Sequence, residues 1–248
     1  MRNIKLTIEY DGTNYVGFQT QRTKDCKSPT IQETLEKALK RICKHKINLV
    51  ASGRTDSGVH ALAQVANFKT NSKMPLDKFR VAINANIPED ISVTKVEEVA
   101  SDFHSRYGAK SKIYRYQILN RPYRSVFEGK LCYMIPHKLD FDLMKQEIRC
   151  LRGKHDFKAF QAADKKKKKS VRTIKSIKLT QKGDFIIFEI EADGFLFKMV
   201  RNIMGTLIEI GRGRFKEGSL KRILKSKNRK LAGPTAPARG LTLIKVKY

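Results

Sequence analysis

The loop around which the chain is organised reads Ser52-Gly53-Arg54-Thr55-Asp56-Ser57-Gly58-Val59-His60. A short apolar run at residues 47–51 precedes it and is typical of a strand. Gly53 and Gly58 tolerate backbone angles that other residues avoid, so the loop can turn sharply and a ligand can approach closely. Asp56 is then either a functional carboxylate held outward on a rigid stem or a turn residue that caps its own backbone. The spacing alone leaves both interpretations open, because it matches no phosphate, metal or hydrolase signature.

The composition favours a nucleic-acid partner. The chain has 248 residues, with 52 Lys and Arg against 24 Asp and Glu, and a formal net charge of +28. Such an excess repels itself in a compact fold unless a polyanion relieves it, and each phosphate that is neutralised releases counterions. A membrane surface is the weaker alternative, because no run of about 18 apolar residues occurs.

The N-terminus and the cysteines indicate a cytoplasmic protein without a metal site. Residues 1–6 run directly into an alternating strand with no apolar signal core. The four cysteines are widely spaced and form no C-x-x-C pair, so neither a zinc site nor a disulfide framework is expected. Cys43 and Cys150 fall in predicted helices, where buried free thiols are the ordinary explanation.

The first part of the chain predicts the order strand-helix-strand-strand-helix-strand. Apolar residues alternate at residues 4–8 and 91–99, and strands are also expected at 47–51 and 64–68. Ser28-Pro29 predicts the start of one helix, and Pro75 the start of a second. This order is typical of a ferredoxin-like unit with an antiparallel sheet, which is also the layout of many RNA-binding modules.

The second part repeats this plan with variations. Strands are expected at 113–119, 171–180, 185–191 and 241–246, with a hairpin turn at Lys182-Gly183-Asp184. Helices are expected from Asp140 to a stop at Gly153, over the apolar segment 195–210, and from Ser219. We therefore predict an α+β fold of two halves, with residues 1–104 carrying the Asp56 loop and residues 105–248 forming the second half.

Three further residues and one run of lysines are candidates for chemistry or for RNA binding. Arg201 lies in the most apolar predicted helix and is either paired with a buried carboxylate such as Asp56 or located at the polar edge of the helix. Tyr114 lies on a strand beside Arg115 and could stack on a base, although most strand tyrosines are core residues. Arg54 could contact a phosphate or face solvent. The basic run from Lys165 to Lys169 could bind the RNA phosphate backbone without regard to sequence, or it could form a solvated loop.

At this point the sequence resembles one family closely, the tRNA pseudouridine synthase A family. The resemblance covers nearly the whole chain, and the Arg-Thr-Asp core is its most specific part. The segments that carry it are Tyr10-Asp11-Gly12-Thr13-Asn14-Tyr15 with Gly17-Phe18-Gln19, residues 53–60, Tyr114-Arg115-Tyr116, Phe195 with Met199-Val200-Arg201-Asn202, and Pro237-Ala238-Arg239-Gly240-Leu241. Residues 155–160 match the family loosely, and the lysine run departs from its pattern.

The resemblance implies an isomerase that converts uridine to pseudouridine at positions 38, 39 and 40 in the anticodon stem-loop of tRNA. It implies two ferredoxin-like (RRM-like) halves whose antiparallel sheets join into one extended mixed sheet, with the active-site cleft between them. It also implies a homodimer that needs neither a metal nor an organic cofactor. Asp56 would be the catalytic carboxylate and Arg201 its partner, Tyr114 would stack on the uracil, and Arg54 would help displace the base.

Two other functions remain open from the sequence. One is a pseudouridine synthase that acts on other RNA, such as ribosomal RNA, and the other is a non-catalytic basic RNA-binding protein. Substitution of Asp56 separates the second from an enzyme, because only an enzyme requires the carboxylate.

Overall fold

The computed structural model describes residues 1–20, 28–163 and 169–248 and divides the chain into two compact units. The first unit comprises Met1–Lys110 with Leu243–Tyr248, and the second comprises Ser111–Thr242. The sequence predicts a boundary near His104. In the structure, the first unit extends to Lys110 and also includes the last six residues of the chain. Tyr248 accounts for the return: its ring packs against Phe103 with centroids 5.0 Å apart, and its hydroxyl donates to the Ser105 carbonyl at 2.7 Å.

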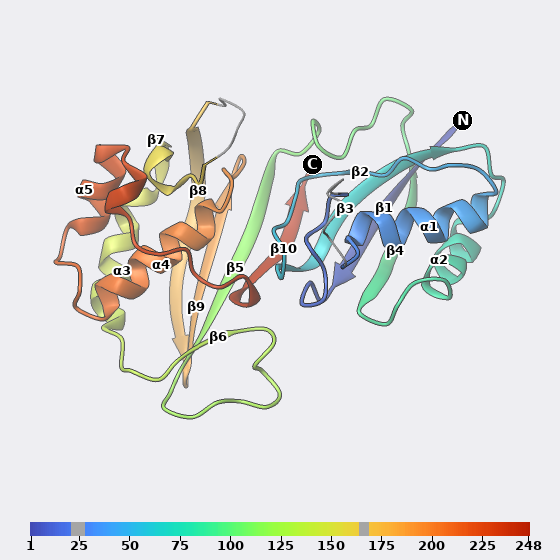
Figure 1. Cartoon of the computed structure of the whole chain (residues 1–248). Coiled ribbons are helices and arrows are strands. Elements are labelled where there is room, and N and C mark those ends of the chain that lie inside the picture. Colours follow the sequence, from blue (N-terminus) through green and yellow to red (C-terminus); the bar gives the residue numbers. More distant parts are fainter. Residues whose placement is uncertain (21–27, 164–168) are drawn as a thin grey trace. The chain divides into compact units, whose positions relative to one another are not determined.

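The first unit has the predicted element order. Its elements are β1 (Arg2–Tyr10), α1 (Ile31–Cys43), β2 (Val50–Ala51), β3 (His60–Thr70), α2 (Leu76–Asn84) and β4 (Ile91–Val99). β1 pairs antiparallel with both β3 and β4, and the alternating residues Ile4, Leu6 and Ile8 are buried. Figure 1 shows α1 and α2 together on one face of this sheet, so the period-2 pattern of β1 gives the apolar face that the helices cover.

Two boundaries in the first unit differ from the prediction. The sequence predicts Ser28 as the N-cap and Pro29 as the first residue of this helix, but α1 begins at Ile31 with Thr30 as its N-cap. The reason is a capping box, in which the side chains of Thr30 and Glu33 each accept a hydrogen bond from the backbone N–H of the other. The strand expected at 47–51 is reduced to Val50–Ala51, whereas β3 is longer than expected and already includes His60. The Asp56 loop is therefore a short connection between two paired strands.

The capping box gives a stability prediction. Thr30→Ala removes the acceptor for the Glu33 N–H in a buried position, and we expect the free energy of unfolding to fall by about 1 kcal/mol. Urea denaturation measures this loss. Glu33→Gln is the control, because glutamine can make the reciprocal bond of a capping box and should leave stability nearly unchanged. An unchanged midpoint for Thr30→Ala would contradict the role given to the box.

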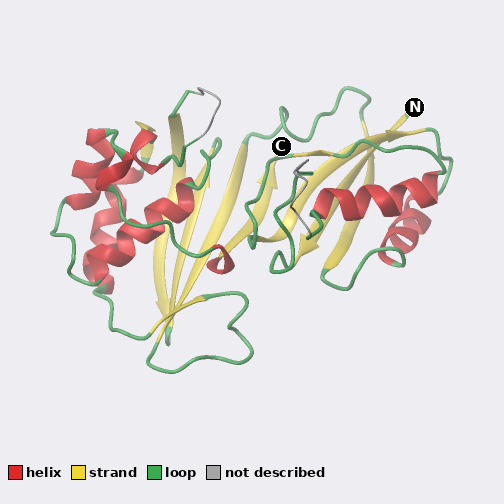
Figure 2. Cartoon of the chain, viewed as in Figure 1, coloured by secondary structure: helices red, strands yellow, loops and turns green. Residues whose placement is uncertain are grey.

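The second unit contains a mixed sheet in the order β5-β9-β8-β7, with β6 parallel to β5 and the other pairs antiparallel. Its elements are β5 (Ser111–Asn120), β6 (Tyr133–Ile135), α3 (Phe141–Glu147), β7 (Gly153–Asp156), β8 (Val171–Lys182), β9 (Phe185–Ala192), α4 (Met199–Gly211) and α5 (Ser219–Ser226). Short 3-10 turns occupy Ile148–Leu151, Lys158–Phe160, Arg229–Leu231 and Ala238–Gly240. The last strand, β10 (Leu241–Lys247), begins in this unit and ends in the first. Strands and helices of both units confirm the α+β class (Figure 2).

The helices of the second unit start or stop differently from the prediction. α4 begins at Met199, not Phe195, because Lys198 adopts a left-handed conformation with φ of 58°. α3 is capped by Asp140 as expected, but it ends at Glu147 and gives way to a 3-10 turn. Gly153, expected as a helix stop, instead opens β7 with φ of 100°. Nearly all of α4 is buried, and it packs against α3 and α5 in the helical layer of this unit (Figure 1).

In the part of the chain that the structure describes, Cys43, Cys132 and Cys150 are free thiols, and Cys26 lies outside that part. No helix of residues 1–20, 28–163 and 169–248 is long and apolar enough to cross a membrane. These same residues contain no group of three or more His, Cys, Asp or Glu placed to hold a metal ion.

Candidate functional site

The entry to the Asp56 loop is fixed by a buried side chain of β3. The Ser52 hydroxyl donates to Oε1 of Gln64 at 2.7 Å, and Nε2 of Gln64 donates to the Gly53 carbonyl at 3.0 Å. Ser52 and Gln64 are both fully buried. Because a buried amide must satisfy its donors and acceptor, Gln64 holds the first two loop residues in one position.

The far side of the loop packs against the segment that follows β1. The hydroxyls of Tyr10 and Thr55 are 2.8 Å apart, and the Phe18 N–H donates to the Thr55 carbonyl at 3.2 Å. Burial raises the pKa of Tyr10, so this hydroxyl stays neutral. A β-carbon on Gly12 would overlap the carbonyl of Val59, so the two backbones approach as closely as only glycine allows.

These anchors present Asp56 at the surface of a rigid turn. The Val59 N–H donates to the Asp56 carbonyl at 3.1 Å, and Gly58 closes the turn with φ of 74°. Asp56 itself is half-buried, while its neighbours Arg54 and Ser57 are exposed. Among the described residues, the Arg54 guanidinium has no hydrogen bond or ion pair, so its donors remain available to a ligand.

Two polar contacts beside the loop escaped the sequence interpretation. Nδ1 of the buried His60 lies 3.0 Å from Oδ1 of Asp11 and 3.1 Å from the Gly12 nitrogen. The Tyr15 hydroxyl donates to Asp90 at 2.5 Å, and burial together with the Asp90 carboxylate raises the pKa of Tyr15. His60 is the first residue of β3 and is buried beside the Asp11 turn, which is typical of a structural histidine. In the sequence, the only signal for the contact between Asp11 and His60 was that both belong to segments shared with the family, residues 10–15 and 53–60.

In the second unit, Tyr114 lies on β5 opposite Ile190 of β9. Tyr114 is buried, with 8% of the residue's surface exposed, and its ring meets Phe195 edge to face, with centroids 5.1 Å apart and planes at 87°. Tyr116, two residues further along β5, is a core residue: it is fully buried, and its hydroxyl donates to the Pro237 carbonyl at 2.8 Å. Burial also raises the pKa of Tyr116. Of the two tyrosines, only Tyr114 keeps any exposed surface.

Arg201 lies in the first turn of α4 and is half-buried. Its Nε donates to the Ala236 carbonyl at 2.8 Å, and the Ala236 N–H donates back to the Arg201 carbonyl at 3.0 Å. The loop that contains Ala236 thus orients the guanidinium. The next residue, Asn202, is fully buried and accepts hydrogen bonds from Thr235 at 2.7 Å and Arg229 at 3.1 Å.

The predicted residues therefore fall into two groups. Asp56 and Arg54 share one anchored loop of the first unit, and Tyr114 and Arg201 are fixed on β5 and α4 of the second. Of the lysine run at residues 165–169, only Lys169 belongs to the part of the chain that the structure describes.

A family model described as tRNA pseudouridine synthase matches residues 6–108 and 148–248. The chain belongs to the tRNA pseudouridine synthase family. It is therefore an enzyme of the isomerase class, as the motif segments implied.

Curated members of the tRNA pseudouridine synthase family match the chain over its full length. A tRNA pseudouridine synthase A of Acetivibrio thermocellus is 47% identical over 248 residues, with all of both chains covered. A tRNA pseudouridine synthase A 2 of Clostridium perfringens is 48% identical, also over the whole of both chains. A crystal structure of a Cbf5-Nop10-Gar1 complex matches with 11% identity and a TM-score of 0.37, covering 97% of this chain and 48% of that one.

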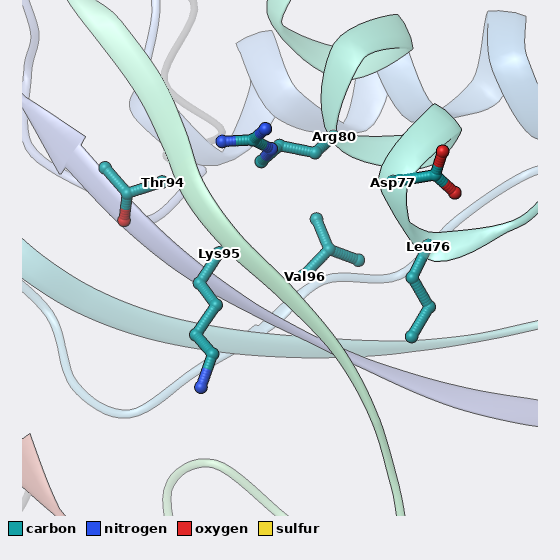
Figure 3. A pocket seen from close by; sticks show the side chains of 6 residues that line it. All are labelled: Leu76, Asp77, Arg80, Thr94, Lys95 and Val96. Atoms are coloured by element: carbon teal, nitrogen blue, oxygen red, sulfur yellow. The ribbon is translucent and has the colours of Figure 1, made fainter.

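A small cavity of the first unit is lined by none of the residues that the family resemblance singles out. It has a volume of about 220 Å³ and is lined by Leu76, Asp77 and Arg80 of α2 and by Thr94, Lys95 and Val96 of β4 (Figure 3). Its charges are of both signs, and it includes no residue of the Asp56 loop. We assign it no part in the reaction of the tRNA pseudouridine synthase family.

Proposed function

We propose that this enzyme converts uridine to pseudouridine at positions 38, 39 and 40 in the anticodon stem-loop of tRNA. The observation that carries the proposal is the full-length identity of 47% to a relative named tRNA pseudouridine synthase A. The Asp56 loop supports it physically, because both of its sides are anchored while Asp56 stays half-exposed. A carboxylate held in this way can contact a nucleotide without the loss of conformational entropy that ordering a loop on binding would cost.

In the proposed reaction, the N1–C1′ bond of the uridine breaks, the uracil rotates, and its C5 bonds to C1′. Asp56 is the catalytic carboxylate, which either attacks the sugar or removes one of its protons. We assign Arg201 to pair with Asp56, and the Ala236 contact that orients its guanidinium supports this role. No atom is gained or lost, so the reaction is an isomerisation and needs no co-substrate.

The target uridine must leave its stack before the sugar can react, which costs a few kcal/mol. We assign Tyr114 to stack on the extruded uracil, and the edge-to-face contact with Phe195, which fixes its ring, favours this role. We assign Arg54 to the space that the base vacates, because its exposed guanidinium has no partner among the described residues. An arginine can stack and donate hydrogen bonds in such a place.

The test is a direct assay on unmodified RNA. The purified protein is incubated with a tRNA transcript that has uridines at positions 38, 39 and 40, and pseudouridines are mapped by carbodiimide treatment and primer extension. We expect stops at these positions and at no other uridine. A ribosomal RNA fragment serves as the second substrate, and modification of that RNA alone would replace tRNA as the substrate.

We further propose that the enzyme is a homodimer in the cytoplasm, where its tRNA substrate occurs. The loop between β5 and β6 (Figure 1) contains exposed apolar side chains: Phe127 is 93% exposed and Val126 83% exposed. Large apolar side chains so close together favour burial against protein rather than water. A second copy of the chain would bury the same loop.

Replacing both residues tests the dimer. We expect the wild-type protein to have twice the chain mass of 28.4 kDa in light scattering, and Val126→Asp with Phe127→Asp to yield the single-chain mass. Leu231→Asp is the control, because Leu231 is also exposed, at 53%, but lies elsewhere in the second unit. A wild-type protein with the mass of one chain would overturn the homodimer.

A further inference from the structure

The second unit contains a basic cavity that the proposed reaction does not use. It has a volume of about 390 Å³ and lies between α5, the 3-10 turn Ile148–Leu151 and β7. Lys221, Lys225 and Lys227 line it together with Asp156 of β7. We call it the α5 cavity.

The one carboxylate of the α5 cavity is already engaged. Asp156 forms an ion pair with Nζ of Lys227 at 3.2 Å and accepts hydrogen bonds from the Ser170 hydroxyl and the Lys158 N–H. Partial burial opposes its ionisation, but these three donors outweigh that effect and lower the pKa of Asp156. Lys221 and Lys225 have no hydrogen bond or ion pair among the described residues. The cavity therefore keeps an excess of positive charge.

Helix stability does not explain this arrangement. Lys221 is the third residue of α5, where the positive end of the helix dipole disfavours a cation. It also stands four residues before Lys225, and like charges at this spacing destabilise a helix by a few tenths of a kcal/mol. α5 contains no acidic residue to offset either effect. An anion between the two ammonium groups would remove both costs.

The floor of the α5 cavity strengthens such an interaction. It includes the buried Leu224 and the half-buried Cys150, and burial raises the pKa of the Cys150 thiol to about 11, so the thiol is neutral. Apolar walls beneath charges of one sign focus the electric field on a ligand. Lysine is a strong point-charge partner for phosphate.

We propose that the α5 cavity binds a backbone phosphate of the RNA substrate, away from the uridine that reacts. The identity of that RNA as tRNA rests on the proposed function. β9 and β8 separate β7 from β5, and three strand spacings of about 4.8 Å put β7 at least roughly 14 Å across the sheet from β5, which carries Tyr114. Lys221 and Lys225 therefore contact a nucleotide other than the one that stacks on Tyr114.

The first test compares two double variants with the same change in charge. In Lys221→Gln with Lys225→Gln we expect KM and Kd for tRNA to rise about tenfold, and the salt dependence of log Kd to become shallower by about one to two. The rate at saturating tRNA should stay unchanged, because neither lysine touches the uridine. Lys37→Gln with Lys40→Gln, at two exposed positions of α1, is the matched control and should behave as wild type. Equal losses in both double variants would overturn the proposal.

The second test maps the lysines directly. The wild-type protein is labelled with an amine-reactive ester alone, with tRNA, or with inorganic phosphate, and labelling is read by mass spectrometry. We expect tRNA to protect Lys221 and Lys225 and inorganic phosphate to leave them reactive. Full labelling in the presence of tRNA, or equal protection by phosphate, would overturn an RNA site. Protection by tRNA that yields no pseudouridine would instead count against the proposed function and leave the cavity assignment standing.

Discussion

Asp56→Asn should abolish pseudouridine formation while tRNA still binds. The amide has the shape of the carboxylate but is neutral, so it can neither attack the sugar nor accept one of its protons. We expect the single-turnover rate to fall by about 10³-fold or more. Because phosphate contacts dominate the affinity for RNA, Kd for tRNA should change by no more than about threefold.

Asp77→Asn is the matched control for this variant. It makes the same chemical change at an exposed position of α2 in the same unit. It should keep the wild-type rate, and both variants should keep the wild-type melting temperature. If Asp56→Asn retained more than a tenth of the activity, the carboxylate would not be the catalytic group, and a non-catalytic role for the loop would be favoured.

The regular elements were predictable where one face of a strand is buried. The alternation at residues 91–99 predicted β4 with its observed bounds, and the alternation at 4–8 located β1. Helix starts were less predictable, because Ser28 and Thr30 are both favourable capping residues and only the reciprocal bond with Glu33 decides between them. The start of α4 could not be foreseen, since a left-handed conformation at a lysine has no sequence signal.

In the candidate site, too, the sequence predicted some residues, and the tertiary structure alone showed others. The motif segments by themselves singled out Asp56, Arg54, Tyr114 and Arg201. The side chains that hold them were not singled out, because Gln64 looks like any polar residue of a half-buried strand. Its two bonds to the Asp56 loop join residues 11 and 12 positions apart and depend on how the chain folds back. Residue types can thus indicate chemistry, whereas the support of that chemistry is a property of the tertiary structure.

A glycine in α4 gives the second large effect. Gly205 lies inside a helix, where alanine would ordinarily stabilise the protein by up to about 1 kcal/mol. Here a β-carbon would overlap the carbonyl of Pro234, a backbone atom that cannot turn aside. Gly205→Ala must therefore displace the loop that contains Ala236, which holds Arg201. We expect the free energy of unfolding to fall by about 3 kcal/mol, because steric overlap outweighs helix propensity.

Urea denaturation of two alanine variants in the same helix tests whether Gly205→Ala lowers the free energy of unfolding. Gly211→Ala is the control: its β-carbon would meet chiefly the Met144 side chain, which can change rotamer, so the loss should be about 1 kcal/mol. Gly205→Ala should also lower the rate of pseudouridine formation at temperatures where it is still folded, because the Ala236 carbonyl no longer orients Arg201. A Gly205→Ala protein as stable as wild type would mean that the Pro234 loop yields without cost. Its contact with Arg201 would then not be a fixed part of the site.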